Sequence, residues 1–237
     1  MRDGSARWQR CGVKLQIAGL VAIAIAAFGA GAAWSIAQRD AGSATRSANA
    51  AALPVFRSTE LTPEWTTPSQ LASERSAFPD FILIDQSGRA VTRSDLAGHV
   101  VVANFFFTSC STLCPRLRSA MTKVRDEFRD DRDVLFLSHS VTPEIDTAPV
   151  LAAYARANHI DGEQWRLLTG PRETIFDLAY GGYFVPRPKA GEGNVLHTEL
   201  FVLLDSKQRV RGIYNGTLPI EMGWLTRDIR ELLGKSA

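Results

Sequence analysis

Two cysteines four positions apart, Cys110 and Cys114, are the residues of this chain best suited to metal or redox chemistry. They follow an apolar run over residues 100–107, and Pro115 directly after them is typical of the first turn of a helix. At such a strand-to-helix turn, backbone N–H groups and the helix dipole lower the pKa of a thiol. The pattern therefore predicts a reactive or metal-binding pair.

A third ligand is expected from a histidine. Residues i and i+4 at a helix start point the same way, so both sulfurs can reach one ion. Soft thiolates with an imidazole suit Cu(I) and Zn(II), and two thiolates plus one histidine form a familiar copper ligand set. We expect His197 to supply the imidazole, because the glycine-rich residues 191–194 before it can close on the cysteines without strain. His139, on a strand expected beside the cysteine loop, is the alternative ligand or supporting group.

A purely structural role for the cysteine pair is less well supported. A disulfide between Cys110 and Cys114 would close a very short loop and constrain the unfolded chain only weakly. A pair that cycles between dithiol and disulfide, or that binds metal, explains the spacing better.

Composition restricts the class of protein. A chain of 237 residues that is 45% hydrophobic and 22% charged predicts one globular domain with accessory segments. The net charge is +2, and no long basic stretch is interleaved with aromatic residues. We therefore expect no nucleic-acid partner.

The N-terminal region predicts a membrane anchor. Residues 15–37 carry no charge, and a bilayer-spanning helix needs about 20 residues. Basic residues outnumber acidic ones before this segment, which places residues 1–14 in the cytoplasm and the rest of the chain across the membrane: Arg2, Arg7, Arg10 and Lys14 against Asp3. We expect a single-pass protein of a bacterial inner membrane with its C-terminal domain in the periplasm. A cleaved signal peptide is the alternative, because residues 29–33 are small enough to form a cleavage site.

The remaining pattern predicts a linker and one α/β domain. Residues 38–75 are rich in Ala, Ser, Thr and Pro and are expected to form a linker, although residues 61–71 are left undecided between linker and domain. Strands are expected at residues 81–84, 89–92, 100–107, 134–141, 165–168, 199–205 and 210–214, and helices at 114–129, 146–158, 172–179 and 221–233. This order is typical of a thioredoxin-like domain, assigned to residues 76–237.

Four segments resemble the Sco/SenC family of membrane-tethered copper proteins: FFFTSCSTLCP around the cysteine pair, SVTPEIDTAPVLAAYA at 140–155, WRLLTG at 165–170 and NVLHTELFVLLD at 194–205. The resemblance covers about residues 76–233. It implies a thioredoxin-like fold that binds one copper, as Cu(I) or Cu(II), through Cys110, Cys114 and His197. It also implies assembly of the dinuclear copper centre of cytochrome c oxidase, either by copper delivery or by reduction of the target cysteines. The implied partners are the copper-bearing oxidase subunit and a periplasmic thiol reductant or copper donor.

Two positions depart from the family pattern. Thr142 stands where the family often has aspartate, and Leu196 stands where an acidic residue often precedes the histidine. Both changes remove negative charge near the site, so we expect them to affect partner docking or Cu(II) affinity and to leave the ligands unchanged.

Two other function classes share part of the pattern. A thiol-disulfide oxidoreductase acting on a metalloprotein's cysteines would typically have C-x-x-C spacing, whereas three residues separate the cysteines here. A peroxiredoxin-like peroxidase would need a threonine and an arginine around its nucleophile; Thr108 and Arg116 flank the pair, but the motif differs. We therefore predict a binding and transfer protein rather than an enzyme, with thiol-disulfide reduction by Cys110 and Cys114 as its possible catalytic activity.

Overall fold

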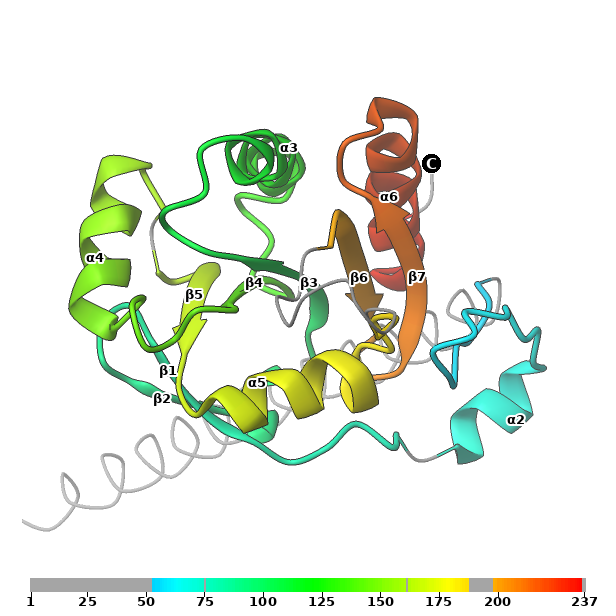
Figure 1. Cartoon of the computed structure of the whole chain (residues 1–237). Coiled ribbons are helices and arrows are strands. Elements are labelled where there is room, and N and C mark those ends of the chain that lie inside the picture. Colours follow the sequence, from blue (N-terminus) through cyan, green and yellow to red (C-terminus); the bar gives the residue numbers. More distant parts are fainter. Residues whose placement is uncertain (1–52, 75, 161, 188–197, 236–237) are drawn as a thin grey trace, which may run out of the picture. The chain divides into compact units, whose positions relative to one another are not determined.

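The computed structural model describes residues 53–74, 76–160, 162–187 and 198–235 (Figure 1). All of them belong to a compact unit formed by residues 46–237. The expected membrane segment at 15–37, the first part of the expected linker and His197 lie outside the described residues. Within the described ranges, no helix is long and apolar enough to cross a membrane.

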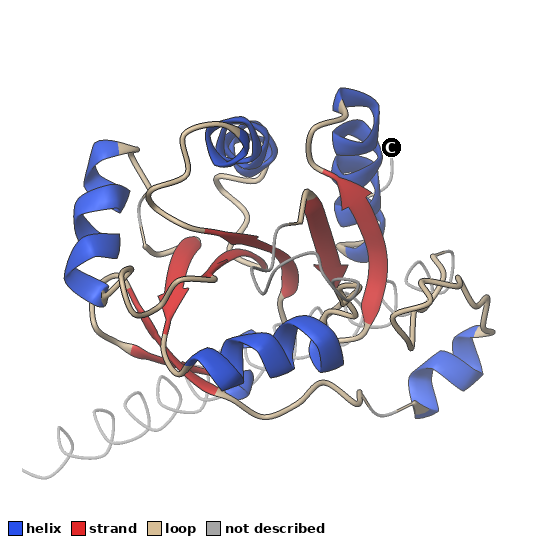
Figure 2. Cartoon of the chain, viewed as in Figure 1, coloured by secondary structure: helices blue, strands red, loops and turns tan. Residues whose placement is uncertain are grey.

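One seven-stranded mixed sheet forms the centre of this unit, with the strand order β2-β1-β5-β4-β3-β6-β7 (Figure 2). Strands β3, β4 and β5 are parallel, and the hairpins β1-β2 and β6-β7 extend the two edges with antiparallel strands. The strands are β1 (Ile82–Asp85), β2 (Ala90–Thr92), β3 (Val100–Phe106), β4 (Val134–Ser140), β5 (Trp165–Thr169), β6 (Leu200–Leu204) and β7 (Val210–Asn215). The α-helices are α2 (Pro68–Ser73), α3 (Leu113–Glu127), α4 (Ala148–Ala157), α5 (Arg172–Asp177) and α6 (Pro219–Leu232). A 3-10 turn at Arg93–Leu96 precedes β3.

The predicted strands and the long helices are confirmed, with ends that differ by at most two residues. The apolar run at 100–107 is β3, and all seven of its residues are buried, as expected for a strand covered on both faces. The helix expected at 172–179 differs, because α5 ends at Asp177 and continues as a π-helical turn, Leu178–Gly182. A side chain at Gly182 would approach Phe78 to within 2.9 Å, so the missing side chain lets the two segments pack closely.

Helices cover both faces of the sheet and create two apolar cores (Figure 1). Residues of α3, α4 and α6 pack on one face, and residues of α5 with the π-helical turn pack on the other. Alternate β3 residues serve different cores: Val102 and Phe106 face α3, whereas Val101 and Phe105 face α5. The turn that follows β3 is therefore attached to a strand that is buried on both faces.

Residues 53–74 pack on the domain, although the sequence predicted a linker here and left only residues 61–71 undecided. Phe56 forms an isolated bridge with Val210 of β7, and Leu53, Val55 and Leu71 are buried in the apolar core to which α3, α4 and α6 contribute. The expected linker at 38–75 is therefore corrected over this stretch, and we call residues 53–74 the N-terminal strap.

Two buried arginines hold the N-terminal strap against the domain: Arg209, in the turn before β7, and Arg211, within β7. The Arg211 guanidinium has no exposed surface and donates to the backbone carbonyls of Leu53 and Pro54 and to the Asp205 carboxylate. Arg209 donates to the Leu71 carbonyl and to the same carboxylate. A buried charge is costly unless it is paired and hydrogen-bonded. The carbonyls of the N-terminal strap therefore replace hydrogen bonds that both guanidinium groups would otherwise make to water.

Candidate metal centre

The turn between β3 and α3 places the two cysteines as the sequence predicts. Cys110 lies in the turn and is half-buried, whereas Cys114 lies in the first turn of α3 and is 7% exposed. The Cys114 backbone N–H donates to Cys110 Sγ at 3.3 Å, and the two thiols share a hydrogen bond. Two soft donors thus lie in direct contact at the edge of the sheet.

The two thiols differ in acidity. Burial opposes ionisation of Cys110, but hydrogen bonds to its sulfur from the Cys114 thiol and from backbone N–H groups of residues 112–114 lower its pKa overall. Burial, with the Cys110 hydrogen bond, raises the pKa of Cys114 to about 12. Cys110 is therefore the more acidic and the more accessible thiol, and Cys114 stabilises it as a hydrogen-bond donor.

A buried carboxylate fastens the cysteine turn to the neighbouring strand. Asp146 is 1% exposed and accepts hydrogen bonds from the Thr108 backbone N–H at 3.1 Å and from the Thr108 hydroxyl. It also accepts from the Ser140 hydroxyl at 2.6 Å and the Thr142 hydroxyl at 3.1 Å. Thr108 begins the turn that carries Cys110, so Asp146 fixes where that turn leaves β3.

Asp146 was expected to begin a helix, and the structure gives it a different role. Helix α4 begins at Ala148 with Thr147 at its N-cap, two residues after Asp146. Thr142, noted as a departure from the family pattern, contributes a hydroxyl to the Asp146 cluster. The signal available in the sequence was Ser140 and Thr142 followed by Asp146 at the carboxyl end of β4, beside the carboxyl end of the parallel strand β3.

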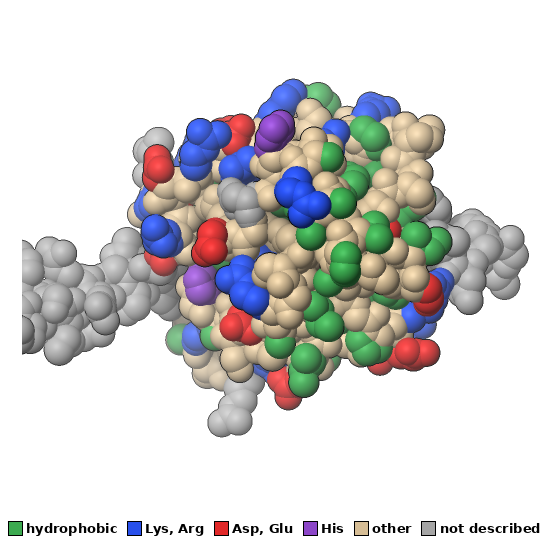
Figure 3. All heavy atoms as spheres, turned by 90° about the vertical axis from the view of Figure 1, so that its left-hand side faces the viewer, with side chains coloured by type: hydrophobic (Ala, Val, Ile, Leu, Met, Phe, Trp, Pro, Cys, Tyr) green, Lys and Arg blue, Asp and Glu red, His purple; other side chains and the backbone are tan. Residues whose placement is uncertain are grey.

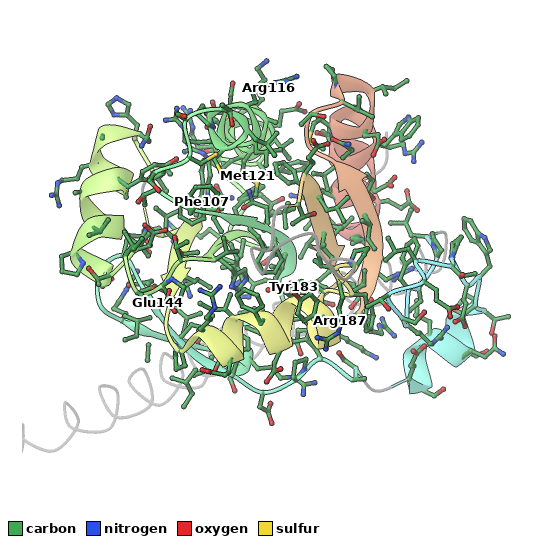
Figure 4. The ribbon with its side chains drawn as sticks, in the orientation of Figure 1. Phe107, Arg116, Met121, Glu144, Tyr183 and Arg187 are labelled. Atoms are coloured by element: carbon green, nitrogen blue, oxygen red, sulfur yellow. The ribbon has the colours of Figure 1, made fainter. Side chains whose placement is uncertain are left out.

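An apolar layer supports the thiols from below. Phe107 and Met121 lie between α3 and the sheet, whereas Arg116 points from α3 into solvent (Figure 4). Met121 has no exposed surface, and the Phe106 ring packs against Tyr154 of α4 with ring centroids 5.6 Å apart. This layer keeps water from the buried side of the pair, which is why desolvation dominates the pKa of Cys114.

The face of the molecule that carries α4 shows hydrophobic side chains gathered mainly on one half and charged side chains mainly on the other (Figure 3). The large hydrophobic residues exposed on α4 and the loop before it are Ile145 and Val150, at 61% and 38%. Both lie close in sequence to Asp146, so apolar surface borders the loop that fastens the cysteine turn.

His139, the alternative ligand, is not brought to the cysteines. Neighbouring residues of a strand face opposite sides of the sheet, and His139 lies in the core beneath α5 while Ser138 and Ser140 face α3. Its ring stacks on Phe105 at 5.3 Å, and its Nε2 is 2.9 Å from the Tyr183 hydroxyl. Complete burial lowers the pKa of His139 to about 3. Its role in the described part of the chain is core packing.

His197 lies outside the described residues, but the strand that follows it is well placed. Strand β6 is antiparallel to β3, with Val101 opposite Leu204 and Ala103 opposite Val202. Continuing this register brings the start of β6 to the edge of the sheet at which β3 ends and the cysteine turn begins. Among the residues that the structure describes, no group of three or more His, Cys, Asp or Glu side chains is placed to hold a metal.

Comparison with known proteins agrees with these features. The family model described as SCO1/SenC matches residues 69–234. The SCO1 protein homolog of Bacillus subtilis (strain 168) is 32% identical over 140 residues, which cover 57% of this chain and 72% of that protein. The mitochondrial SCO1 homolog of Homo sapiens is 30% identical over 135 residues, which cover 52% of this chain and 42% of that protein.

Solved structures of related proteins share the fold. A SCO1/SenC family lipoprotein from Bacillus anthracis str. Ames has a TM-score of 0.58 and 31% identity, covering 65% of this chain and 94% of its own. BsSco, described as a member of the Sco family of cytochrome c oxidase assembly proteins with a disulfide switch, has a TM-score of 0.59 and 27% identity over 67% and 94% of the two chains. Copper-bound ScoI of Arabidopsis thaliana has a TM-score of 0.54 and 26% identity over 66% and 98%. The mixed α/β, thioredoxin-like fold expected from the sequence is thereby confirmed.

The buried histidine predicts acid sensitivity. A histidine in an unfolded chain has a pKa of about 6.5, and burial of His139 lowers its pKa to about 3. Between these values the unfolded chain binds a proton that the folded protein does not bind, so stability falls as the pH drops below about 6.5. The free energy of unfolding should fall by about 2 kcal/mol at pH 5 from this residue alone.

Urea unfolding at pH 7 and pH 5 measures this effect, with His139→Gln as the comparison because glutamine does not titrate. The loss of stability between the two pH values should be smaller in the variant by that amount. The same pH dependence in both chains would show that His139 is not a buried neutral group.

Proposed function

The chain belongs to the SCO1/SenC family, and from this premise we propose that it is a copper-binding assembly factor for cytochrome c oxidase. It delivers copper to the dinuclear copper centre of the oxidase, or it reduces the cysteines that receive that copper. The observation that carries the proposal is the pair of contacting thiols, Cys110 and Cys114, held at the turn between β3 and α3.

The donor set fits copper. Two sulfurs that already share a hydrogen bond can both contact one soft ion once their protons leave, and thiolates with an imidazole suit Cu(I). We propose Cys110, Cys114 and His197 as the ligands, with one copper per chain as cargo. The course of β6 supports His197, because the residues before β6 approach the edge at which the cysteine turn begins. The relative from Arabidopsis thaliana is described with copper bound, and this supports the same cargo here.

The unequal thiols suggest an order of events. Cys110 is accessible and more acidic, so it makes the first contact with incoming copper or with a partner's thiol. Cys114 is buried and holds its proton until a cation or a disulfide removes the cost of ionisation. Asp146 keeps the turn in place throughout, because its hydrogen bonds to Thr108 do not involve either sulfur.

The same asymmetry supports thiol-disulfide reduction as a second candidate function. The Cys110 thiolate would attack a disulfide of the target, forming a mixed disulfide and releasing one target thiolate. Cys114 would then attack the Cys110 sulfur, releasing the second target thiolate and leaving a disulfide between Cys110 and Cys114. Two electrons and two protons pass to the target in this exchange, and a periplasmic thiol reductant would restore the pair.

We also propose the cellular arrangement expected from the sequence: residues 1–14 in the cytoplasm, residues 15–37 as the anchor in a bacterial inner membrane, and the α/β domain in the periplasm. A reporter enzyme that works only outside the cytoplasm, fused after Ala237, should be active, and the full-length chain should fractionate with membranes. Shortened material released from the membrane would show that the apolar segment is cleaved.

Tight copper binding should require both cysteines. Anaerobic titration of the reduced full-length chain with Cu(I), followed by dialysis against a copper chelator, should leave one bound copper. Cys110→Ser and Cys114→Ser should each lose tight binding, because one thiolate and one imidazole cannot complete the set. Cys11→Ser is the matched control and should keep its copper. Tight binding in either site variant would contradict the two-thiolate site.

In the same titration, His197→Ala should weaken the binding of Cu(II) and of Cu(I) to different extents. Cu(II) prefers nitrogen ligands, so its binding should suffer more than that of Cu(I), which the thiolates hold. The visible thiolate-to-copper charge-transfer band reports the change. An unchanged Cu(II) spectrum would remove His197 from the ligand set.

Copper loading and disulfide formation should exclude each other, because both use the same two sulfurs and copper needs them as thiolates. Oxidising Cys110 and Cys114 should abolish copper binding, and reduction should restore it. Deleting the gene should lower oxidase activity, and added copper should partly restore it. Rescue by a thiol reductant and not by copper would make reduction of the target cysteines the main role.

A further inference from the structure

A groove with a volume of about 720 Å³ lies between α3 and α6, which are neighbours above the sheet (Figure 1). Its lining along α3 begins at Pro115, the residue directly after Cys114, and continues to Glu127. At 1.5 Å per residue this is about 18 Å of helix. That length matches about five residues of extended chain. A segment seated there would have one end beside the thiol pair.

The groove is positively charged. Arg116 and Lys123 line it, are exposed, and have no ion-pair partner within the described part of the chain. Arg116 projects from α3 into solvent in the side-chain view (Figure 4). At the far end Arg230 pairs with Glu127, so these two charges balance each other. The two remaining positive charges favour an anionic occupant.

The floor of the groove is apolar, and Gly223 adds a position without a side chain to its lining. Ala120, Val124 and Met222 contribute apolar surface. Gly223 lies inside α6, where glycine costs about 1 kcal/mol relative to alanine. A side chain at Gly223 would meet no atom within 4 Å, so internal packing does not require this glycine.

Gly216, which also lines the groove, contrasts with Gly223. A side chain at Gly216 would come within 2.7 Å of Leu117 and 3.0 Å of Phe201, so close packing explains that glycine. Gly223 lines the groove and is exposed, so a side chain there would add to the lining of the groove without displacing packed atoms next to its Cβ.

We propose that this groove docks an acidic, extended segment of the protein that exchanges copper or electrons with Cys110 and Cys114. The carboxylates of the segment face Arg116 and Lys123, and its small or apolar residues rest on the floor beside Gly223. The inference rests on the proposed function, since it names how a partner of that same thiol pair is held.

The test measures the affinity of short peptides for the full-length chain in nonionic detergent. Two eight-residue peptides carry an uncharged dye; glutamate alternates with alanine in one and lysine alternates with alanine in the other. Fluorescence anisotropy should show the acidic peptide binding about tenfold more tightly than the basic one, with the difference shrinking as salt screens the charges.

Two variants of the groove and one control variant outside it assign that preference to the groove. Arg116→Glu combined with Lys123→Glu should abolish it, whereas Arg156→Glu, at an exposed arginine on α4 outside the groove, should preserve it. Gly223→Phe should weaken the acidic peptide about tenfold without changing the charge, because the added ring fills the floor. A Cβ at this exposed position would meet no atom within 4 Å, so the variant is expected to fold.

Equal affinity for the two peptides would overturn the docking groove, as would an acidic preference that survives both the double charge reversal and Gly223→Phe. Copper titration of the same chains separates this result from a failure of the proposed function. Intact copper binding without peptide preference removes the groove alone, whereas absence of copper binding in the unaltered chain removes the proposed copper function.

Discussion

Strand β3 is the constraint on which the rest of the domain depends. Because both of its faces are buried, it needs helices above and below the sheet and a neighbouring strand on each side to bond its backbone. The parallel neighbour β4 brings the loop that contains Asp146 to the end of β3, and the antiparallel neighbour β6 begins at that same edge. One buried strand thus gathers the cysteine turn, its supporting carboxylate and the start of β6 at one place.

The chemistry at this edge follows from an uneven environment. Cys110 receives hydrogen bonds from the start of α3, whereas Cys114 is buried in the same apolar cluster as Met121, with Phe107 packed against it. One thiol is therefore easily ionised and the other is not. A pair of this kind can accept a soft cation or exchange a disulfide, and both capacities are part of the function proposed for this member of the SCO1/SenC family.

Two further features of the domain lie outside the cysteine turn, the N-terminal strap and the groove between α3 and α6. The buried guanidinium groups of Arg209 and Arg211 tie the strap to β7, which sets the domain boundary at residue 53 or before it. The groove between α3 and α6 begins beside Cys114 and is lined by Arg116 and Lys123. A partner held there would reach the thiols without disturbing Asp146.

The sequence by itself determined the strands, the long helices and the position of the cysteine pair at a strand-to-helix turn, because apolar periodicity and helix-start signals are local properties. It did not determine the acidity of the pair: both thiols were expected to have a lowered pKa, and burial instead raises the pKa of Cys114. Tertiary structure decided the rest. Arg211 finds the Leu53 carbonyl 158 residues away, and nothing near either residue in the sequence specifies that contact. Alternation along β4 separates His139 from Ser138 and Ser140, but packing of α3 and α5 decides which face meets the cysteine turn. Asp146 has the pattern of a helix start, and only the arrival of Thr108 from β3 makes it a support of the site, because a buried carboxylate takes the donors that folding brings to it.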